Sequence, residues 1–143
     1  MILRKLAVEW TGSYAYGGDL SARMPTVAFD CRLATSWLGR LSGEIVDGAG
    51  GVPEPATIAG RVRGRRVTFE KRHAHFWIDD GGELKPLKDA SVPPIRYVGE
   101  VTDGGRVVAG TWTFLEYHRP IGDTMCRFPE IGGTWTMVAK AAG

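Results

Sequence analysis

The chain has 143 residues, of which 43% are hydrophobic and 24% charged, and its formal net charge is +2. This length suits one domain over residues 1–143, with a core large enough to fold without a metal or disulfide. The 20 glycines and 8 prolines are spread along the chain, which is typical of short strands joined by turns rather than of disorder. The small charge does not indicate a nucleic-acid partner. Since the chain shows neither a signal peptide nor an apolar run of membrane-spanning length, we expect a cytoplasmic protein with no membrane partner.

Alternating apolar residues predict strands throughout the N-terminal half of the chain. In Lys5–Tyr16, the face of Leu6, Val8 and Trp10 continues through Tyr14. The same alternation predicts four further strands, at Thr26–Ala34, Leu38–Asp47, Ala56–Val62 and Arg65–His73. The sequence Phe76–Ile78 predicts a short strand, and an irregular polar excursion follows it up to Pro94.

Residues 95–114 predict a β-hairpin around Asp103-Gly104-Gly105, because Asp-Gly between alternating runs supplies the positive φ of a tight turn. The segment that leads into this turn, Gly99–Gly104, resembles the earlier segment Gly43–Gly48 in sequence. A hairpin motif used twice indicates a β-meander. After it, residues 116–129 predict an irregular stretch, and Gly132–Lys140 predicts the last strand.

These elements predict an all-β fold, a single antiparallel up-and-down β-barrel of about eight to ten strands. No segment of the sequence keeps helical periodicity, so at most a short helix is expected. A β-sandwich is the main alternative, but closure of a meander into a barrel also removes its exposed edges.

The segment Trp10–Tyr14 and the recurrent Gly-Thr-Trp at Gly110–Trp112 and Gly133–Trp135 resemble calycin-type barrels. These are the lipocalins, the fatty-acid-binding proteins and the avidin-like barrels, and the chain resembles a bacterial relative of them. The lipocalin first-strand signature carries glycine where this chain has Val8. The resemblance implies a cavity for a small, partly apolar molecule, and it implies no chemistry and no cofactor.

If the barrel holds a ligand, aromatic side chains on the predicted inner faces are the candidates to line its cavity. Gly99 and Gly110 leave space beside the rings of Tyr97 and Trp112, and the alternative is that large neighbours on facing strands fill this space. The candidate ligand-binding residues are Tyr14, Phe69, Lys71, His73, Tyr97, Trp112 and Phe114.

Lys71 and His73 follow Phe69 at alternate positions, so a regular strand aims both side chains inward. A charged lysine inside an apolar barrel is costly unless it is paired, so Lys71 favours an anionic ligand or a nearby carboxylate. The alternative is that the strand ends here and both groups reach solvent at the rim.

We therefore expect non-enzymatic binding of a small hydrophobic or amphipathic ligand. One alternative is a barrel-mouth isomerase or cyclase on a lipid-like substrate, for which His73, Tyr97 and Glu116 are the candidates. The other is an interaction module with a packed barrel, in which Trp37, Leu38, Val107 and Ala109 form the face of a homodimer.

The remaining reactive and charged residues predict no further site. The sequence contains no catalytic signature or metal-ligand spacing, and Cys31 and Cys126 are expected to be free, buried thiols. Alternation divides the basic cluster between both faces of one hairpin, which indicates a solvated surface: Arg61, Arg63, Arg65, Arg66, Lys71 and Arg72.

Overall fold

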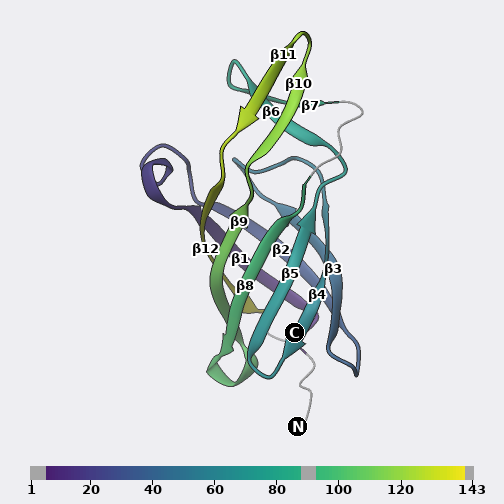
Figure 1. The fold of residues 1–143 in the computed structure, drawn as a ribbon. Helices are drawn as coiled ribbons and strands as arrows, with labels where there is room; N and C mark the ends of the chain where they lie inside the picture. Colours follow the sequence, from purple (N-terminus) through teal and green to yellow (C-terminus); the bar gives the residue numbers. More distant parts are fainter. Residues whose placement is uncertain (1–5, 88–92, 141–143) are drawn as a thin grey trace.

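A computed structural model describes residues 6–87 and 93–140, and its core is an eight-stranded, closed antiparallel barrel (Figure 1). The strands lie around the barrel in the order β1-β12-β9-β8-β5-β4-β3-β2. Their bounds are β1 Glu9–Tyr16, β2 Val27–Thr35, β3 Arg40–Asp47, β4 Ala56–Arg63, β5 Arg66–Arg72, β8 Ile95–Thr102, β9 Val107–Phe114 and β12 Ile131–Ala139. The predicted all-β up-and-down barrel is confirmed.

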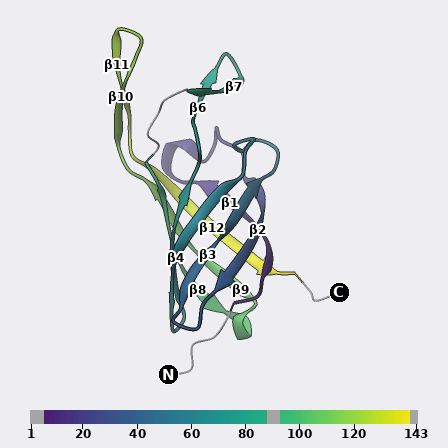
Figure 2. The ribbon, with the colours of Figure 1, turned by 90° about the vertical axis from the view of Figure 1, so that its right-hand side faces the viewer.

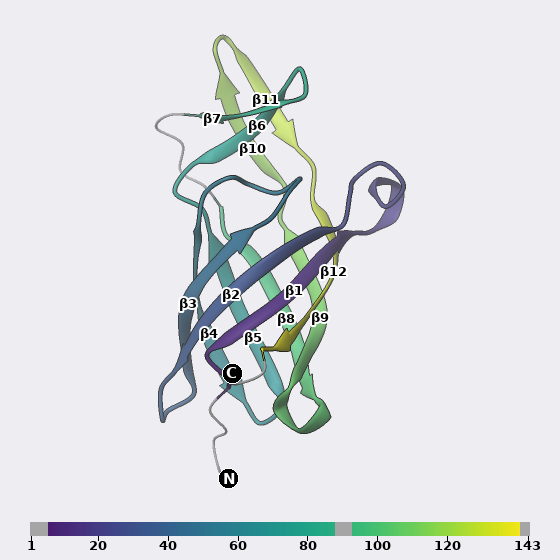
Figure 3. The same cartoon turned by 180° about the vertical axis from the view of Figure 1, so that it is seen from behind.

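Two hairpins are inserted into this meander and extend from one end of the barrel. β6 (Phe76–Asp80) pairs with β7 (Glu83–Leu87), and β10 (Tyr117–Ile121) pairs with β11 (Thr124–Phe128). Both hairpins lie at the same end, which we call the mouth (Figures 1 and 2). The opposite end, seen from behind in Figure 3, carries the β2–β3, β4–β5 and β8–β9 connections, and we call it the short-turn end.

Most predicted strands are present, and the turn after β8 forms as expected. Asp103, Gly104 and Gly105 all have positive φ, and they form a short 3₁₀ turn between the two strands. The predicted irregular stretch 116–129 is instead the β10–β11 hairpin, and the polar excursion contains β7. Both were missed because these strands pair outside the barrel sheet, and charged residues and proline interrupt the alternation of their apolar residues. Lys5 of the first predicted strand, residues 88–92 of the excursion and the tail after Lys140 lie outside the described residues.

The barrel core is built from aromatic rings that face glycines on the neighbouring strand. Trp135 pairs across the ladder with Gly110, and its indole nitrogen donates to the carbonyl oxygens of Val98 and Thr111 at 3.2 and 3.0 Å. A Cβ on Gly99 would lie only 2.6 Å from the Trp135 ring. The space beside Gly99 and Gly110 is therefore filled by a large neighbour, the second of the two alternatives drawn from the sequence.

The same arrangement recurs in other parts of the barrel. Trp112 faces Gly133, and its indole nitrogen donates to the carbonyl oxygen of Ala15 at 3.1 Å. Two further cross-strand pairs place an aromatic residue opposite glycine, Phe29–Gly12 and Phe69–Gly60. An aromatic ring that covers a glycine restores the packing that the missing side chain leaves open. The recurrent Gly-x-Trp of the sequence is thus a packing device of the barrel wall.

Helices contribute little to this fold. Besides the turn at Asp103–Gly105, a three-residue 3₁₀ helix spans Gly18–Leu20 in the connection from β1 to β2. In the part of the chain that the structure describes, no helix has the length and apolar character needed to cross a bilayer.

Candidate ligand-binding site at the barrel mouth

An ion pair lies inside the barrel at its mouth end. The Lys71 Nζ, on β5, is 3.0 Å from Oδ1 of Asp47, the last residue of β3. The side chains are 2% and 1% exposed, and no other ion pair found among the described residues is buried on both sides. A buried charge is tolerated only with a partner. The structure therefore places the predicted inward lysine beside a carboxylate rather than at a solvent-exposed rim.

Asp47 is also held by two further donors. The Tyr14 hydroxyl donates to Oδ2 of Asp47 at 3.0 Å, and the backbone N–H of Val52 donates to the same oxygen at 3.3 Å. Gly51 lies directly against this carboxylate, since a Cβ there would approach Oδ2 to 2.8 Å. The connection from β3 to β4 thus folds back over Asp47 and keeps the carboxylate away from water.

Burial changes the protonation of the groups around this pair. Desolvation lowers the pKa of the Lys71 ammonium, and the Asp47 charge acts against this effect. Desolvation also raises the pKa of Tyr14, and the neighbouring Asp47 charge raises it further. The tyrosine therefore stays neutral and acts as a hydrogen-bond donor at physiological pH.

His73 follows Lys71 by two residues toward the mouth. Its Nδ1 is buried without a hydrogen-bond partner in the structure. Desolvation and the Lys71 charge lower the pKa of His73 to about 4, so its ring is neutral at pH 7. A buried ring nitrogen without a partner is uncommon in folded proteins and identifies a place where a ligand or a water molecule can hydrogen-bond.

Aromatic rings form the wall next to the ion pair. The Tyr14 ring is 5.8 Å from Trp112 and 6.0 Å from Tyr16, in both cases edge to face. The Lys71 Nζ lies 5.0 Å from the centre of the Tyr14 ring and 6.0 Å from that of Tyr97. These cation–π contacts add to the stabilisation of the buried ammonium.

Above the ion pair, the apolar lining of the barrel is only partly buried. Tyr16, Ile95, Phe114 and Ile131 pack against the core but keep part of their surface exposed. Each lies at the mouth end of its strand and shares the inward phase of the core residues that precede or follow it. We call these four residues the mouth ring. They present apolar surface just where the barrel opens toward the two hairpins.

Glu54 fastens one side of the mouth. Its carboxylate accepts hydrogen bonds from the His75 backbone N–H at 3.0 Å and the Trp77 indole nitrogen at 2.8 Å, and the His75 ring nitrogen lies 2.8 Å away. Desolvation raises the pKa of Glu54, but these contacts together outweigh it, so the pKa is lowered. The β3–β4 connection is thereby tied to the start of β6.

The other sequence candidates are distributed over separate parts of the molecule. Phe69 and Tyr97 stack on each other with ring centres 4.8 Å apart, one inward position closer to the short-turn end than Lys71. Glu116 instead faces Arg127 and His118 beside the β10–β11 hairpin. The structure thus brings Tyr14, Lys71, His73, Trp112 and Phe114 to the mouth end and leaves Phe69 and Tyr97 in the packed interior.

Both cysteines are free, as expected, but only Cys31 is buried. Cys126 is half-buried, because it lies on a hairpin that stands away from the barrel. Among the residues that the structure describes, no group of three potential metal ligands is present.

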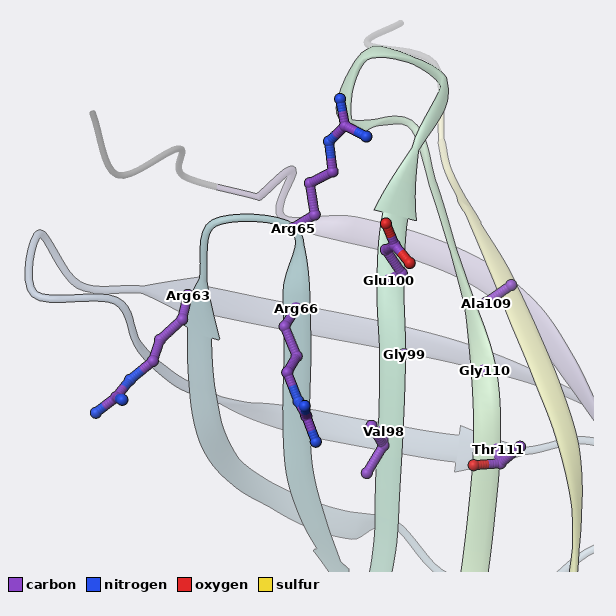
Figure 4. A pocket seen from close by; sticks show the side chains of 9 residues that line it. All are labelled: Arg63, Arg65, Arg66, Val98, Gly99, Glu100, Ala109, Gly110 and Thr111. Atoms are coloured by element: carbon purple, nitrogen blue, oxygen red, sulfur yellow. The ribbon is translucent and has the colours of Figure 1, made fainter. Parts of the chain in front are cut away.

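The basic cluster is divided between the two sides of the barrel wall: Lys71 lies inside, whereas three of its arginines lie on the outside around a shallow hollow over β5, β8 and β9 (Figure 4). Arg63, Arg65 and Arg66 line this hollow, and their side chains diverge: Arg65 extends past the β4–β5 turn, whereas Arg66 lies along the wall.

The sequence interpretation missed Asp47, the residue that organises the site. Asp47 ends the predicted strand Leu38–Asp47, and the alternation of Leu41 and Ile45 already places it in the inward phase. Its counterpart in the repeated motif, Asp103, forms the turn at the opposite end of the barrel. The signal that could have identified Asp47 was the need of inward Lys71 for a counter-charge.

Comparison with known proteins adds no relative: no family model, no curated protein and no solved structure matches this chain.

Proposed function

We propose that this protein binds a small, partly apolar molecule at the barrel mouth and does not catalyse a reaction on it. The observation that carries this proposal is the mouth ring, half-buried apolar side chains that stand over a buried Lys71–Asp47 pair. Ligand sites are typically apolar hollows with a few well-placed polar groups. In this proposal the mouth ring contacts the apolar part of the ligand, and the unpartnered Nδ1 of His73 bonds its polar group.

The polar group of the ligand need not be anionic. Lys71 is already neutralised by Asp47, so an added carboxylate gains little from it. We therefore expect a dansyl-labelled fatty acid and the corresponding dansyl-labelled fatty alcohol to bind with similar affinity, each saturating at one site in a fluorescence titration.

Two variants distinguish ligand binding at the mouth from binding elsewhere on the surface. Phe114→Ser removes an aromatic member of the mouth ring, and we expect about a tenfold loss of affinity for both probes, given the area that such a ring buries. Leu115→Ser is the matched control, because Leu115 is the next residue and is 64% exposed. Absence of saturable binding for both probes, or unchanged affinity in Phe114→Ser, would refute the proposal.

Two broader assignments belong to the same proposal. A relationship to the calycin-type barrels is supported by the eight-stranded, up-and-down closure. A cytoplasmic location is supported by the two free cysteines, because reducing compartments keep thiols unpaired. The alternative of a mouth isomerase or cyclase stays a prediction without a supporting contact, since Glu116 pairs with Arg127 and Tyr97 stacks on Phe69.

A further inference from the structure

The β2–β3 turn at the short-turn end presents two large apolar side chains to solvent. Trp37 is 76% exposed and Leu38 65% exposed, and both occupy the tip of the turn. The tips of such turns usually carry glycine, asparagine, aspartate or proline, because these residues suit the backbone and the solvent. Neither Trp37 nor Leu38 packs into the barrel core, so core packing does not explain why the turn carries two apolar residues.

The turn holds these side chains in a fixed position. The Gly39 N–H donates to the Ser36 carbonyl oxygen at 3.0 Å, and the Ser36 N–H donates to the Arg40 carbonyl oxygen at 2.8 Å. The Arg40 N–H also donates to the Ser36 hydroxyl at 3.0 Å, and Gly39 supplies the positive φ of the turn. Trp37 and Leu38 are therefore presented on a preorganised support, which reduces the entropy lost when they bind.

Arginines surround this tip. Arg40 follows it directly and pairs across the ladder with Arg61, and the N–H of Val62 donates to the Gly39 carbonyl oxygen at 2.8 Å. The three connections at this end and their flanking residues carry five arginines and one acidic residue: Arg40, Arg63, Arg65, Arg66, Arg106 and Asp103. Figure 4 shows Arg65 extending beyond the barrel end.

The mouth end has the opposite balance. In its connections and hairpins, the acidic side chains described outnumber the basic ones: Asp19, Glu54, Glu83, Glu116, Asp123 and Glu130 against Arg23, Lys85, Arg119 and Arg127. An anionic surface would therefore attract the short-turn end and turn the mouth away from itself.

We propose that the short-turn end docks on an anionic lipid bilayer, with Trp37 and Leu38 entering the interface and Arg40 and Arg65 facing the headgroups. Tryptophan favours the boundary between headgroups and acyl chains, and basic residues are attracted to anionic lipid. This contact needs no membrane-spanning helix, because only a turn enters the bilayer. The inference is independent of ligand binding at the mouth.

The shape and charge of this surface favour a bilayer over two other occupants. A protruding tip with two apolar side chains falls short of the roughly 800 Å² per partner that a stable protein interface buries. A second copy in a symmetric contact would place the arginines of one tip against those of the other, which costs energy.

Vesicle sedimentation tests the proposal with the full chain. We expect it to bind vesicles of equal parts phosphatidylcholine and phosphatidylglycerol more tightly than vesicles of phosphatidylcholine alone, and less tightly as salt is added. Trp37→Ser with Leu38→Ser should lower the partition coefficient at least about tenfold. Arg40→Gln with Arg65→Gln should lower it about 25-fold, since each basic residue near an anionic surface contributes about fivefold.

Matched controls lie at the mouth. Leu115→Ser with Met125→Ser removes two apolar side chains that are 64% and 65% exposed, and Arg23→Gln with Arg127→Gln removes two charges. Both should leave partition unchanged. Brominated lipid should quench Trp37 directly, because Trp10, Trp112 and Trp135 are buried and half-buried Trp77 lies on β6 at the opposite, mouth end. Trp37→Phe should therefore abolish the quenching. The proposal would be overturned if the protein partitioned equally to both vesicle types, or if the control variants lost as much partition as the tip variants. It would also be overturned if the protein bound polyglutamate but no vesicles, or if it formed a dimer that Trp37→Ser dissociated.

Discussion

Replacing Asp47 by asparagine removes the counter-charge of Lys71 while almost preserving the shape of the side chain. The amide keeps one oxygen that can accept a hydrogen bond, but its nitrogen is a donor only and cannot replace the second carboxylate oxygen as an acceptor. The variant therefore leaves a buried ammonium without a counter-charge, next to the rings of Tyr14 and Tyr97.

The distance sets the size of the effect. Unit charges 3.0 Å apart attract by about 5 kcal/mol at an effective dielectric constant of about 20. Breaking a buried pair from one side typically costs 3–5 kcal/mol, and we expect Asp47→Asn to lower the free energy of unfolding by about this amount. Adding Lys71→Met removes the second charge as well, so the double variant should lose only about 1–2 kcal/mol.

Urea unfolding followed by tryptophan fluorescence measures these differences. In the Asp47→Asn variant the native pKa of Lys71 falls further below its unfolded value of about 10.4, so the unfolded state binds more protons. The stability of the variant relative to the wild type should therefore rise with pH.

Asp30→Asn is the control, because Asp30 pairs with Lys140 at 3.1 Å on the surface and should contribute less than about 1 kcal/mol. Equal losses in the two variants, or additive losses in the double variant, would show that burial of the pair does not govern its energy.

Three further outcomes follow from the packing and the titrating groups. Gly99→Ala forces a methyl group against the Trp135 ring and should lower the free energy of unfolding by about 1–3 kcal/mol in urea; an unchanged midpoint would contradict the packing described. Burial raises the pKa of Cys31 to about 12, so at pH 8 a thiol reagent should modify half-buried Cys126 rapidly and Cys31 only slowly, and Cys126→Ser should remove the fast phase. The pKa of His73 is lowered from 6.5 to about 4, so as the pH falls the unfolded state binds this proton before the native state does. The free energy of unfolding should therefore fall between pH 6.5 and 4. In urea titrations over this range, the free energy of unfolding of His73→Gln should depend less steeply on pH.

The barrel could be predicted from the sequence because each of its strands buries one face. Strict alternation in residues 27–35 and the Asp-Gly turn at 103–104 are local signals, and each survives in the structure. The glycines alone could not predict a cavity, since the missing side chain at Gly99 looks the same in the sequence whether a ligand or Trp135 fills the space. Sequence spacing does not show which ring crosses the barrel, and only the closed ladder of β12 on β9 brings Trp135 to Gly110.

The aromatic–glycine pairs also limit where along the barrel the proposed ligand could bind. Eight strands enclose an interior just wide enough for side chains, and rings from β5, β9 and β12 fill it below Lys71. The proposed ligand site therefore lies above the ion pair, where the strands end in their longest connections, residues 17–26, 48–55, 73–94 and 115–130. Because these connections contribute little to the barrel core, they can change in sequence without repacking it. If the proposed ligand binds at the mouth, its selectivity should depend on the connections that surround the mouth, with the buried Lys71–Asp47 pair beneath them.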